Sequence, residues 1–166
     1  MAASVPIVAI DSNMLVWGIR KLGTTDQNQR AIWLFQQLEE DEAQIILPTV
    51  AVSEYLTPLD PATHDAIITE LGRRFILAPF DIKSAALAAR IYAENKNIQL
   101  QIQNQPNARK TLRADCLIVA TARIHGARIF YSGDTGCRSL ASKISGIEAR
   151  DLPAQPPNLF GGPLKT

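Results

Sequence analysis

The 166-residue chain is long enough to form one domain with a substantial core, and its 46% hydrophobic and 20% charged residues exclude a disordered or fibrous protein. The net charge of +1 conceals an asymmetry, because residues 1–95 carry 7 Lys/Arg and 12 Asp/Glu, whereas residues 96–166 carry 10 and 4. A basic half beside an acidic half suits a protein that brings a polyanion to a carboxylate site, but two ordinary solvated faces would have the same charges.

The sequence carries no signal for secretion, membrane insertion or disulfide bonding. Residues 1–10 do not combine a basic start with the apolar stretch of a signal peptide. No uncharged apolar run approaches the ~20 residues of a membrane helix. Cys116 and Cys137 form neither a CxxC pair nor a disulfide framework. We therefore expect a cytoplasmic protein with two reduced thiols and no contact with a membrane.

In chain order, the first half predicts strands alternating with helices. Residues 5–10 form an apolar run that ends at Asp11, as in a central strand covered on both faces. Ser12 and Asn13 suit the N-cap of a short helix over residues 14–19. Further helices are expected at residues 29–42, 49–56, 61–73 and 82–95, and further strands at 44–47 and 75–78.

The second half continues the alternation after a polar stretch. Residues 97–108 are rich in Gln and Asn and are expected to form a loop, of a length at which loops are often functional. Helices at 111–125 and 135–144 and strands at 127–132 and 147–150 are expected next. The last 16 residues contain four Pro and two Gly, which limit strand and helix. We expect one domain over residues 1–150 and a Pro/Gly-rich C-terminal tail over residues 151–166.

This order predicts an α/β fold, a three-layer α/β/α sandwich with a mainly parallel central sheet. In such sheets, ligands bind at the carboxyl ends of the strands, near the point where the strand order reverses. Asp11 follows the first predicted strand, Glu54 the second and Asp134 the fourth. Three acidic side chains are therefore expected at one edge of the sheet.

Most of the acidic residues also have an ordinary structural explanation. Asp11 suits a helix N-cap, Asp115 suits the first turn of a helix, and Asp134 suits a turn after glycine. Glu54 is harder to explain, because its predicted helix is mostly apolar. Its side chain either reaches solvent or is held in place for a reason, since an unpaired buried carboxylate is costly. Carboxylates that meet in one cleft repel unless a cation neutralises them, and an all-oxygen cluster selects Mg²⁺ or Mn²⁺.

Four short motifs resemble those of the PIN-domain nucleases, and among them the single-domain toxins of the VapC type. The resemblance spans approximately residues 7–150. It rests on Ile-Asp-Ser-Asn at 10–13, Ser-Glu-Tyr-Leu at 53–56, Arg-Ala-Asp-Cys-Leu-Ile-Val-Ala-Thr-Ala at 113–122 and Tyr-Ser-Gly-Asp at 131–134. Each motif is weak alone, but their order, spacing and predicted placement make the set specific.

The resemblance implies a site and an activity. The acidic quartet of the family corresponds to Asp11, Glu54, Asp115 and Asp134, with Asn13 and Ser132 as supporting polar residues. It implies a PIN-like fold, bound Mg²⁺ or Mn²⁺, and hydrolysis of phosphodiesters in single-stranded or looped RNA. It also implies a cognate antitoxin protein and a homodimer. The basic residues before the third acid are candidates for RNA phosphate contacts, although a solvated helix start explains them equally well: Arg109, Lys110 and Arg113.

The sequence departs from the family in one place and leaves three alternatives open. Many members carry another acid two residues after the last Asp, followed by Phe, where this chain has Gly136 and Cys137; tight binding of a second metal is therefore in doubt. A non-catalytic PIN-like RNA-binding protein is one alternative. An Asp-based α/β phosphohydrolase is another, although such enzymes usually carry a second Asp two residues after the first, where this chain has Asn13. A housekeeping member of the family would have the same core as a toxin.

Overall fold

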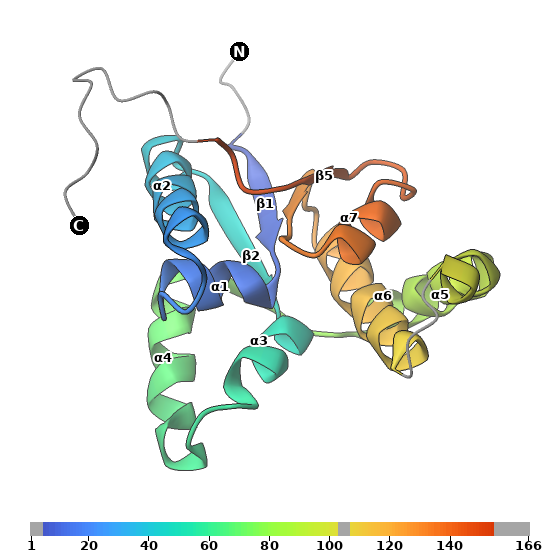
Figure 1. The fold of residues 1–166 in the computed structure, drawn as a ribbon, viewed down its shortest axis with the longest axis horizontal. Helices are drawn as coiled ribbons and strands as arrows, with labels where there is room; N and C mark the ends of the chain where they lie inside the picture. Colours follow the sequence, from blue (N-terminus) through green and yellow to red (C-terminus); the bar gives the residue numbers. More distant parts are fainter. Residues whose placement is uncertain (1–4, 103–106, 155–166) are drawn as a thin grey trace.

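A computed structural model describes residues 5–102 and 107–154, although not the side chains of residues 97–102, and it centres on one five-stranded sheet (Figure 1). Neighbouring strands pair in parallel, in the order β3-β2-β1-β4-β5. The strands are β1 (Ile7–Ile10), β2 (Gln44–Pro48), β3 (Ile76–Ala78), β4 (Ile129–Tyr131) and β5 (Glu148–Arg150). The predicted α/β fold with a mainly parallel central sheet is confirmed.

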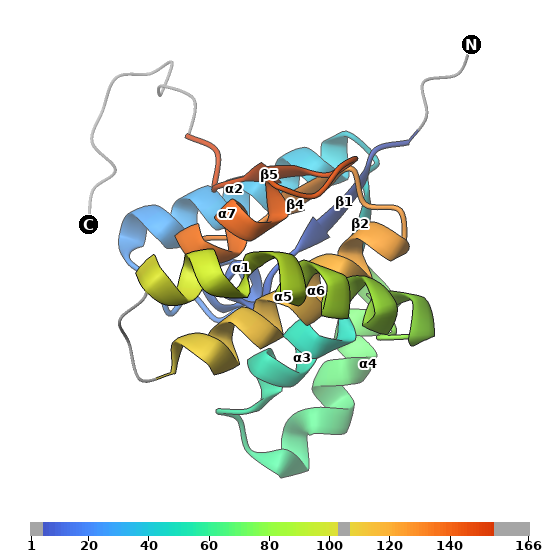
Figure 2. The same cartoon turned by 90° about the vertical axis from the view of Figure 1, so that its right-hand side faces the viewer.

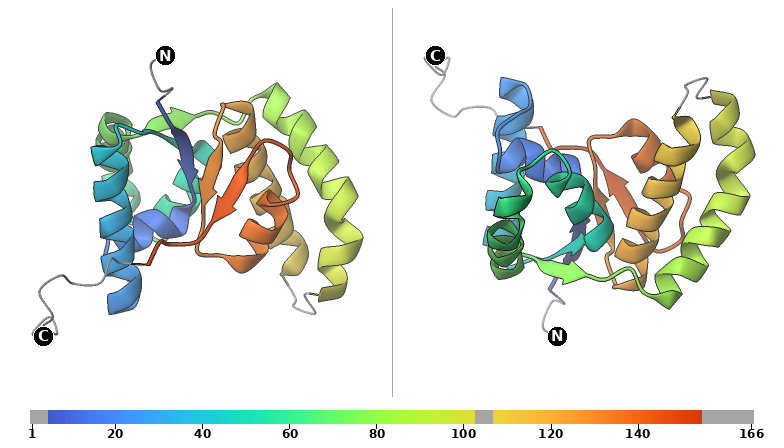
Figure 3. Two further views of the ribbon diagram at one scale, coloured as in Figure 1. Left: turned by 90° about the horizontal axis from the view of Figure 1, so that it is seen from above. Right: turned by 90° about the horizontal axis from the view of Figure 1, so that it is seen from below.

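Helices cover both faces of the sheet, as Figure 3 shows from above and below. They are α1 (Ser12–Gly18), α2 (Thr25–Glu40), α3 (Thr49–Leu56), α4 (His64–Arg74), α5 (Ile82–Ile102), α6 (Ala108–Ile124) and α7 (Thr135–Ala141), with a 3₁₀ turn, η1, at Pro61–Thr63. α1, α2 and α4 lie on one side, and α6 and α7 lie on the other. α5 packs along α6, on the outside of that layer (Figure 2).

The central strand, β1, fixes the position of the sheet's functional edge. Val8, Ala9 and Ile10 are buried, because helices cover both faces and β2 and β4 flank the strand. The chain passes from β1 to β2 on one side and places β4 on the other, so the strand order reverses between β1 and β4. Their carboxyl ends are in register, with Ile10 opposite Tyr131. This edge is where ligands bind in open parallel sheets.

The stretch predicted as a loop over residues 97–108 is the main difference from the expected elements. α5 continues to Ile102 instead of ending at Asn95, and α6 begins at Ala108 rather than Thr111; residues 103–106 lie outside the described residues. The prediction was wrong for 97–102 because Gln and Leu are good helix formers and the stretch contains no Gly or Pro. None of the described helices is both long and apolar enough to cross a bilayer.

The start of the predicted C-terminal tail packs against the domain. Leu152 is 4% exposed and belongs to the hydrophobic core. The guanidinium of Arg30, on α2, donates hydrogen bonds to the backbone carbonyls of Leu152 and Pro153. Residues 151–153 therefore connect the edge strand β5 to α2, which covers one face of the sheet. Residues 155–166 of the predicted tail lie outside the described part of the chain.

Candidate active site

The four acidic residues singled out in the sequence come from four different elements. Asp11 follows β1 and caps α1, Glu54 lies in α3, Asp115 lies in the second turn of α6, and Asp134 caps α7. Asp11 and Asp134 thus flank the reversal of strand order at the carboxyl edge of the sheet.

Asp11 is the most tightly held of the four. Its side chain is 5% exposed, and both carboxylate oxygens accept hydrogen bonds. Oδ1 accepts from the backbone N–H of Ser12 at 2.7 Å, while Oδ2 accepts from Ser132 Oγ at 2.6 Å and from Asn13 Nδ2 at 3.1 Å. The N-cap role considered from the sequence is therefore real. Burial raises the pKa of Asp11 despite the opposing effect of the bonds from Ser132 and Ser12.

The two predicted supporting residues connect the first and last acids. Ser132 Oγ, which donates to Asp11, also accepts from the backbone N–H of Asp134 at 3.1 Å. Asn13 Oδ1 accepts from the N–H of Gly133 at 3.0 Å. A Cβ at Gly133 would lie 1.9 Å from the indole of Trp17, so only glycine allows this close approach. The structure thus places Asn13 and Ser132 between Asp11 and Asp134.

Ser12 links Asp11 to Glu54, a connection that the sequence analysis missed. Its hydroxyl donates to Glu54 Oε2 at 2.9 Å, while its backbone N–H donates to Asp11. Ser12 was interpreted only as a residue suited to capping a helix. The signal in the sequence was a hydroxyl directly after the strand-end Asp, but pairing with a residue 42 positions away depends on how α1 and α3 pack together.

Burial and, after it, repulsion among the carboxylates raise the pKa of acids in the site. The pKa of Asp115 is raised to about 7, first by burial and then by the negative charges of Asp134, Asp11 and Glu54. The pKa of Glu54 is raised by partial burial of its carboxylate and by the charges of Asp11 and Asp134, against the hydrogen bond from Ser12. All four groups therefore lie within range of one another's charge. A cation placed among them would relieve this repulsion.

The donor set determines which cation fits. In the described ranges, no three or more His, Cys, Asp or Glu side chains are arranged as a cage for one ion. Mg²⁺ needs no such cage, because it is usually held by one or two carboxylates together with waters and substrate phosphates. The carboxylates at the edge between β1 and β4 fit an ion of this kind, with oxygen ligands only. They do not fit a structural Zn²⁺ site, which uses Cys and His ligands.

The basic residues before Asp115 do not act as one cluster. Arg109, Lys110 and Arg113 all have exposed side chains on α6. The guanidinium of Arg113 lies 5.3 Å from the ring centroid of Tyr92 and therefore faces α5. Arg109 and Lys110 remain candidates for phosphate contacts.

Another cation, Arg138, borders the site from α7 and was not singled out with them. It donates to the carbonyl of Ser132 at 2.7 Å and to Thr135 Oγ1 at 3.3 Å, and it pairs with Asp151 at 3.4 Å. Arg138 therefore holds the turn that carries Asp134.

Two cavities differ in their relation to the acids. One of about 440 Å³, here called the Asp134 pocket, lies between the start of α6 and the β4–α7 turn and is lined by Asn107, Ala108, Thr111, Gly133, Asp134, Thr135 and Gly136.

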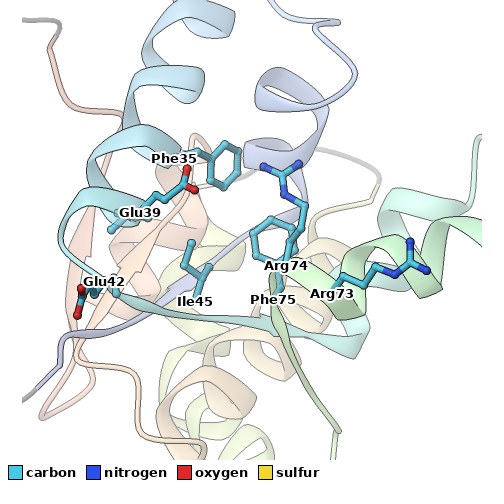
Figure 4. A pocket seen from close by; sticks show the side chains of 9 residues that line it. Phe35, Glu39, Glu42, Ile45, Arg73, Arg74 and Phe75 are labelled. Atoms are coloured by element: carbon cyan, nitrogen blue, oxygen red, sulfur yellow. The ribbon is translucent and has the colours of Figure 1, made fainter.

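The other cavity has about 410 Å³ and lies between the ends of α2 and α4 (Figure 4). Its walls combine Phe35, Phe75 and Ile45 with the charged Glu39, Glu42, Arg73 and Arg74. It contains none of the four acids and lies beside the start of β2, away from the carboxyl edge of the sheet. The Asp134 pocket is the one adjacent to the candidate active site.

Most of the chain matches one protein family. The PIN domain profile matches residues 8–143, which include all four acids. The chain therefore belongs to the PIN domain family, and the resemblance found in the sequence is confirmed.

Solved structures show the same fold at low sequence identity. One chain of VapBC2 from Rickettsia felis, crystallised with a DNA fragment from the promoter, is 14% identical; the match covers 87% of this chain and 98% of that chain, with a TM-score of 0.56. A chain of DNA-bound VapBC from Salmonella typhimurium is also 14% identical, with coverage of 89% and 99% and a TM-score of 0.58. No curated protein matches the chain.

Proposed function

We propose that this protein is a metal-dependent endoribonuclease that hydrolyses phosphodiesters in single-stranded or looped RNA. The observation that carries the proposal is the convergence of Asp11, Glu54, Asp115 and Asp134, from four different elements, on the ligand-binding edge of the sheet. Clustered carboxylates of this kind suit Mg²⁺ or Mn²⁺. Membership of the PIN domain family supports nuclease chemistry, and the basic second half of the chain supports a polyanionic substrate.

The four carboxylates would hold Mg²⁺ or Mn²⁺, which polarises a phosphoryl oxygen and lowers the pKa of bound water. Hydrolysis joins the water oxygen to phosphorus and breaks one ester bond, with a proton passing to the leaving oxygen. The hydrogen bonds to Asp11 fix that carboxylate before substrate arrives, and Ser12 orients Glu54 beside it. Arg109 and Lys110, which are exposed on α6, would contact flanking phosphates.

The Asp-based phosphohydrolase is the weaker alternative. Such enzymes usually carry a second Asp two residues after the strand-end Asp, where this chain has Asn13. The side chains of Asn13 and Ser132 and the backbone N–H of Ser12 donate to the carboxylate of Asp11. An Asp held in this way suits a metal ligand that is oriented by its neighbours.

We also propose that the protein is the toxin of a toxin–antitoxin pair, acting in the cytoplasm as a homodimer and controlled by a cognate antitoxin. The support is the likeness in fold to chains of two VapBC complexes, each matched over nearly its whole length. The family resemblance of the four acidic motifs is the second support. Co-expression with the product of a short neighbouring reading frame tests this proposal, which predicts growth arrest by the protein alone and relief by the pair.

The nuclease proposal is tested by cleavage of a labelled single-stranded RNA. We expect cleavage with Mg²⁺ or Mn²⁺, complete loss in excess EDTA, and recovery when the metal is restored. Asp115→Asn, purified in parallel, controls for contaminating nuclease and should be inactive. Full cleavage in EDTA by the parental protein but not by Asp115→Asn would contradict metal dependence. Equal cleavage by both preparations would assign the activity to a contaminant.

A further inference from the structure

The Asp134 pocket continues directly from the acidic site and has no assigned role. On α6, Ala108, Thr111 and Asp115 follow one another at intervals of three and four residues, so they lie on one face of the helix. Two of them line the pocket and the third is one of the four acids. On the opposite wall, Asp134 belongs both to the pocket and to the acidic site. An RNA strand bound at the acids would therefore extend over this pocket.

The lining of the pocket favours the uncharged part of a nucleotide. Apart from Asp134, its polar side chains are those of Asn107, Thr111 and Thr135, and none of its lining residues is basic. The nearby cations Arg109 and Lys110 are not among the lining residues. A phosphate would meet Asp134 without a compensating cation, whereas a base or ribose would meet neutral donors and acceptors. The volume of about 440 Å³ lies in the range of small-molecule pockets.

Two details of the walls keep the pocket open and polar. Asn107 caps α6 without using its side chain, so its amide remains exposed beside the cavity. Gly136, in the first turn of α7, presents no side chain where its helix faces the pocket. The backbone of Gly136 does not require glycine, because the positive-φ glycines among the described residues are Gly126 and Gly146.

We infer that the Asp134 pocket binds the nucleoside, the base and ribose, of the nucleotide adjacent to the scissile phosphate, and that Asn107 and Thr111 determine which base is preferred. The inference rests on the proposed nuclease function. Selectivity between bases would come from neutral hydrogen-bonding groups, which discriminate strongly because a base with the wrong donors and acceptors leaves them unpaired. An arginine side chain from a protein partner would also fit beside Asp134, and the experiment distinguishes it.

The first measurement maps cleavage in a single-stranded RNA with randomised positions. We expect Asn107→Ala and Thr111→Val to change the relative kcat/KM between bases, at one position next to the cut, by about fivefold or more, the effect of one hydrogen bond. Thr69→Val is the matched control, because Thr69 and Thr111 are both exposed helical threonines whose hydroxyls donate to the carbonyl four residues earlier. An unchanged base profile in both pocket variants, with active enzyme, would contradict the inference while leaving the nuclease proposal intact.

The second measurement does not depend on cleavage. The four nucleosides, which carry no phosphate, are titrated into the metal-free protein, and amide NMR shifts are followed. We expect shifts at Thr111, Thr135 and Gly136 that saturate at different concentrations for different bases. Gly136→Leu, which fills the pocket, should abolish them, and Gly136→Ala, a favourable helix substitution, should weaken them. Shifts that avoid these residues, or that persist in Gly136→Leu, would overturn the inference. A second outcome would also overturn the inference. If Gly136→Leu keeps the parental cleavage profile but is no longer inhibited by an antitoxin, the pocket binds the protein partner and not the nucleoside.

Discussion

At the scale of single residues, the carboxylates of the site are held by hydrogen bonds from uncharged Ser and Asn donors. Asp11 caps a helix, accepts from three donors and repels the other acids at the same time. Asp134 also combines a cap with a place in the site, since its Oδ1 accepts from the N–H of Cys137 at 2.8 Å. A structural role and a role in metal binding are therefore compatible at both positions. Asn caps helices as well as Asp does, so the Asn variants remove charge without removing the cap.

Ser12 gives the most specific prediction at this scale. Ser12→Ala removes the hydroxyl that holds Glu54 at 2.9 Å but keeps the backbone bond to Asp11. We expect kcat to fall by roughly tenfold, with little change in stability, because positioning contacts of metal ligands commonly contribute 10–100-fold. Ser12→Thr should restore activity. Ser139→Ala, at an exposed serine of α7, is the control. A Ser12→Ala enzyme with parental kcat would show that Glu54 needs no such orientation.

Asp115 predicts how stability depends on pH when metal is absent. Its pKa of about 7 in the folded protein exceeds its ordinary value of 3.8, so the folded state binds the proton more tightly. Asp115 therefore lowers the free energy of unfolding progressively as pH rises from about 4 to 7. Asp115→Asn should exceed the parental stability by about 4 kcal/mol at pH 7.5 in EDTA, and by less than about 1 kcal/mol at pH 4.

Thermal melting in EDTA across this pH range measures the difference. Asp60→Asn is the control, because Asp60 is exposed, directly precedes η1 and caps it by accepting from the N–H of Ala62, a bond that Asn can retain. The control should follow the parental curve at every pH. A constant stability difference between Asp115→Asn and the parental protein from pH 4 to 7.5 would contradict the electrostatic account of the site.

At the scale of elements, α7 and the strand before it are joined by Arg138. Its contacts with Ser132, Thr135 and Asp151 connect the β4–α7 turn to the segment after β5. Arg138→Met should lower kcat at least tenfold, because it releases the turn that carries both Asp134 and the Ser132 hydroxyl bonded to Asp11. Arg138→Lys should recover part of this activity, since a lysine keeps the charge but not the fork of donors.

Arg123→Met separates this effect from loss of stability. Arg123 Nε donates to the carbonyl of Ser145 at 2.8 Å, so this arginine also fixes a loop, but one away from the acids. Both Met variants should lower the melting temperature, and only Arg138→Met should lower kcat. Equal loss of kcat in the two variants, in proportion to their melting temperatures, would show that Arg138 contributes only to stability.

The elements also show what the sequence can and cannot predict. Strands such as β1 were predictable because their apolar runs end at Asp or Pro, and the order of elements defined the sheet. The length of α5 could not be predicted in this way, because Gln and Asn at 97–102 suit both a loop and an exposed helix. The acids were found through motifs at strand ends. The contacts that Ser12 and Arg138 make depend on packing between distant segments, which local pattern does not encode.

At the scale of the whole molecule, the parallel sheet brings together acids from positions 11, 54, 115 and 134 of the chain. The reversal of strand order between β1 and β4 leaves an edge where α1, α3, α6 and α7 all present a side chain. The Asp134 pocket adjoins this edge, and the pocket of Figure 4 lies away from it. Metal-dependent cleavage at this edge therefore requires that the four carboxylates together attract and bind a divalent ion.

Titration with Mn²⁺, followed by electron paramagnetic resonance of the free ion, tests this claim most directly. The parental protein should bind Mn²⁺, and Mg²⁺ should displace it. Asp11→Asn, Glu54→Gln, Asp115→Asn and Asp134→Asn should each remain folded and weaken binding at least tenfold, because each removes a negative charge that attracts the ion, directly or through a bound water. Asp60→Asn should bind as the parental protein does. Parental affinity in all four variants, with their folds intact, would contradict the account.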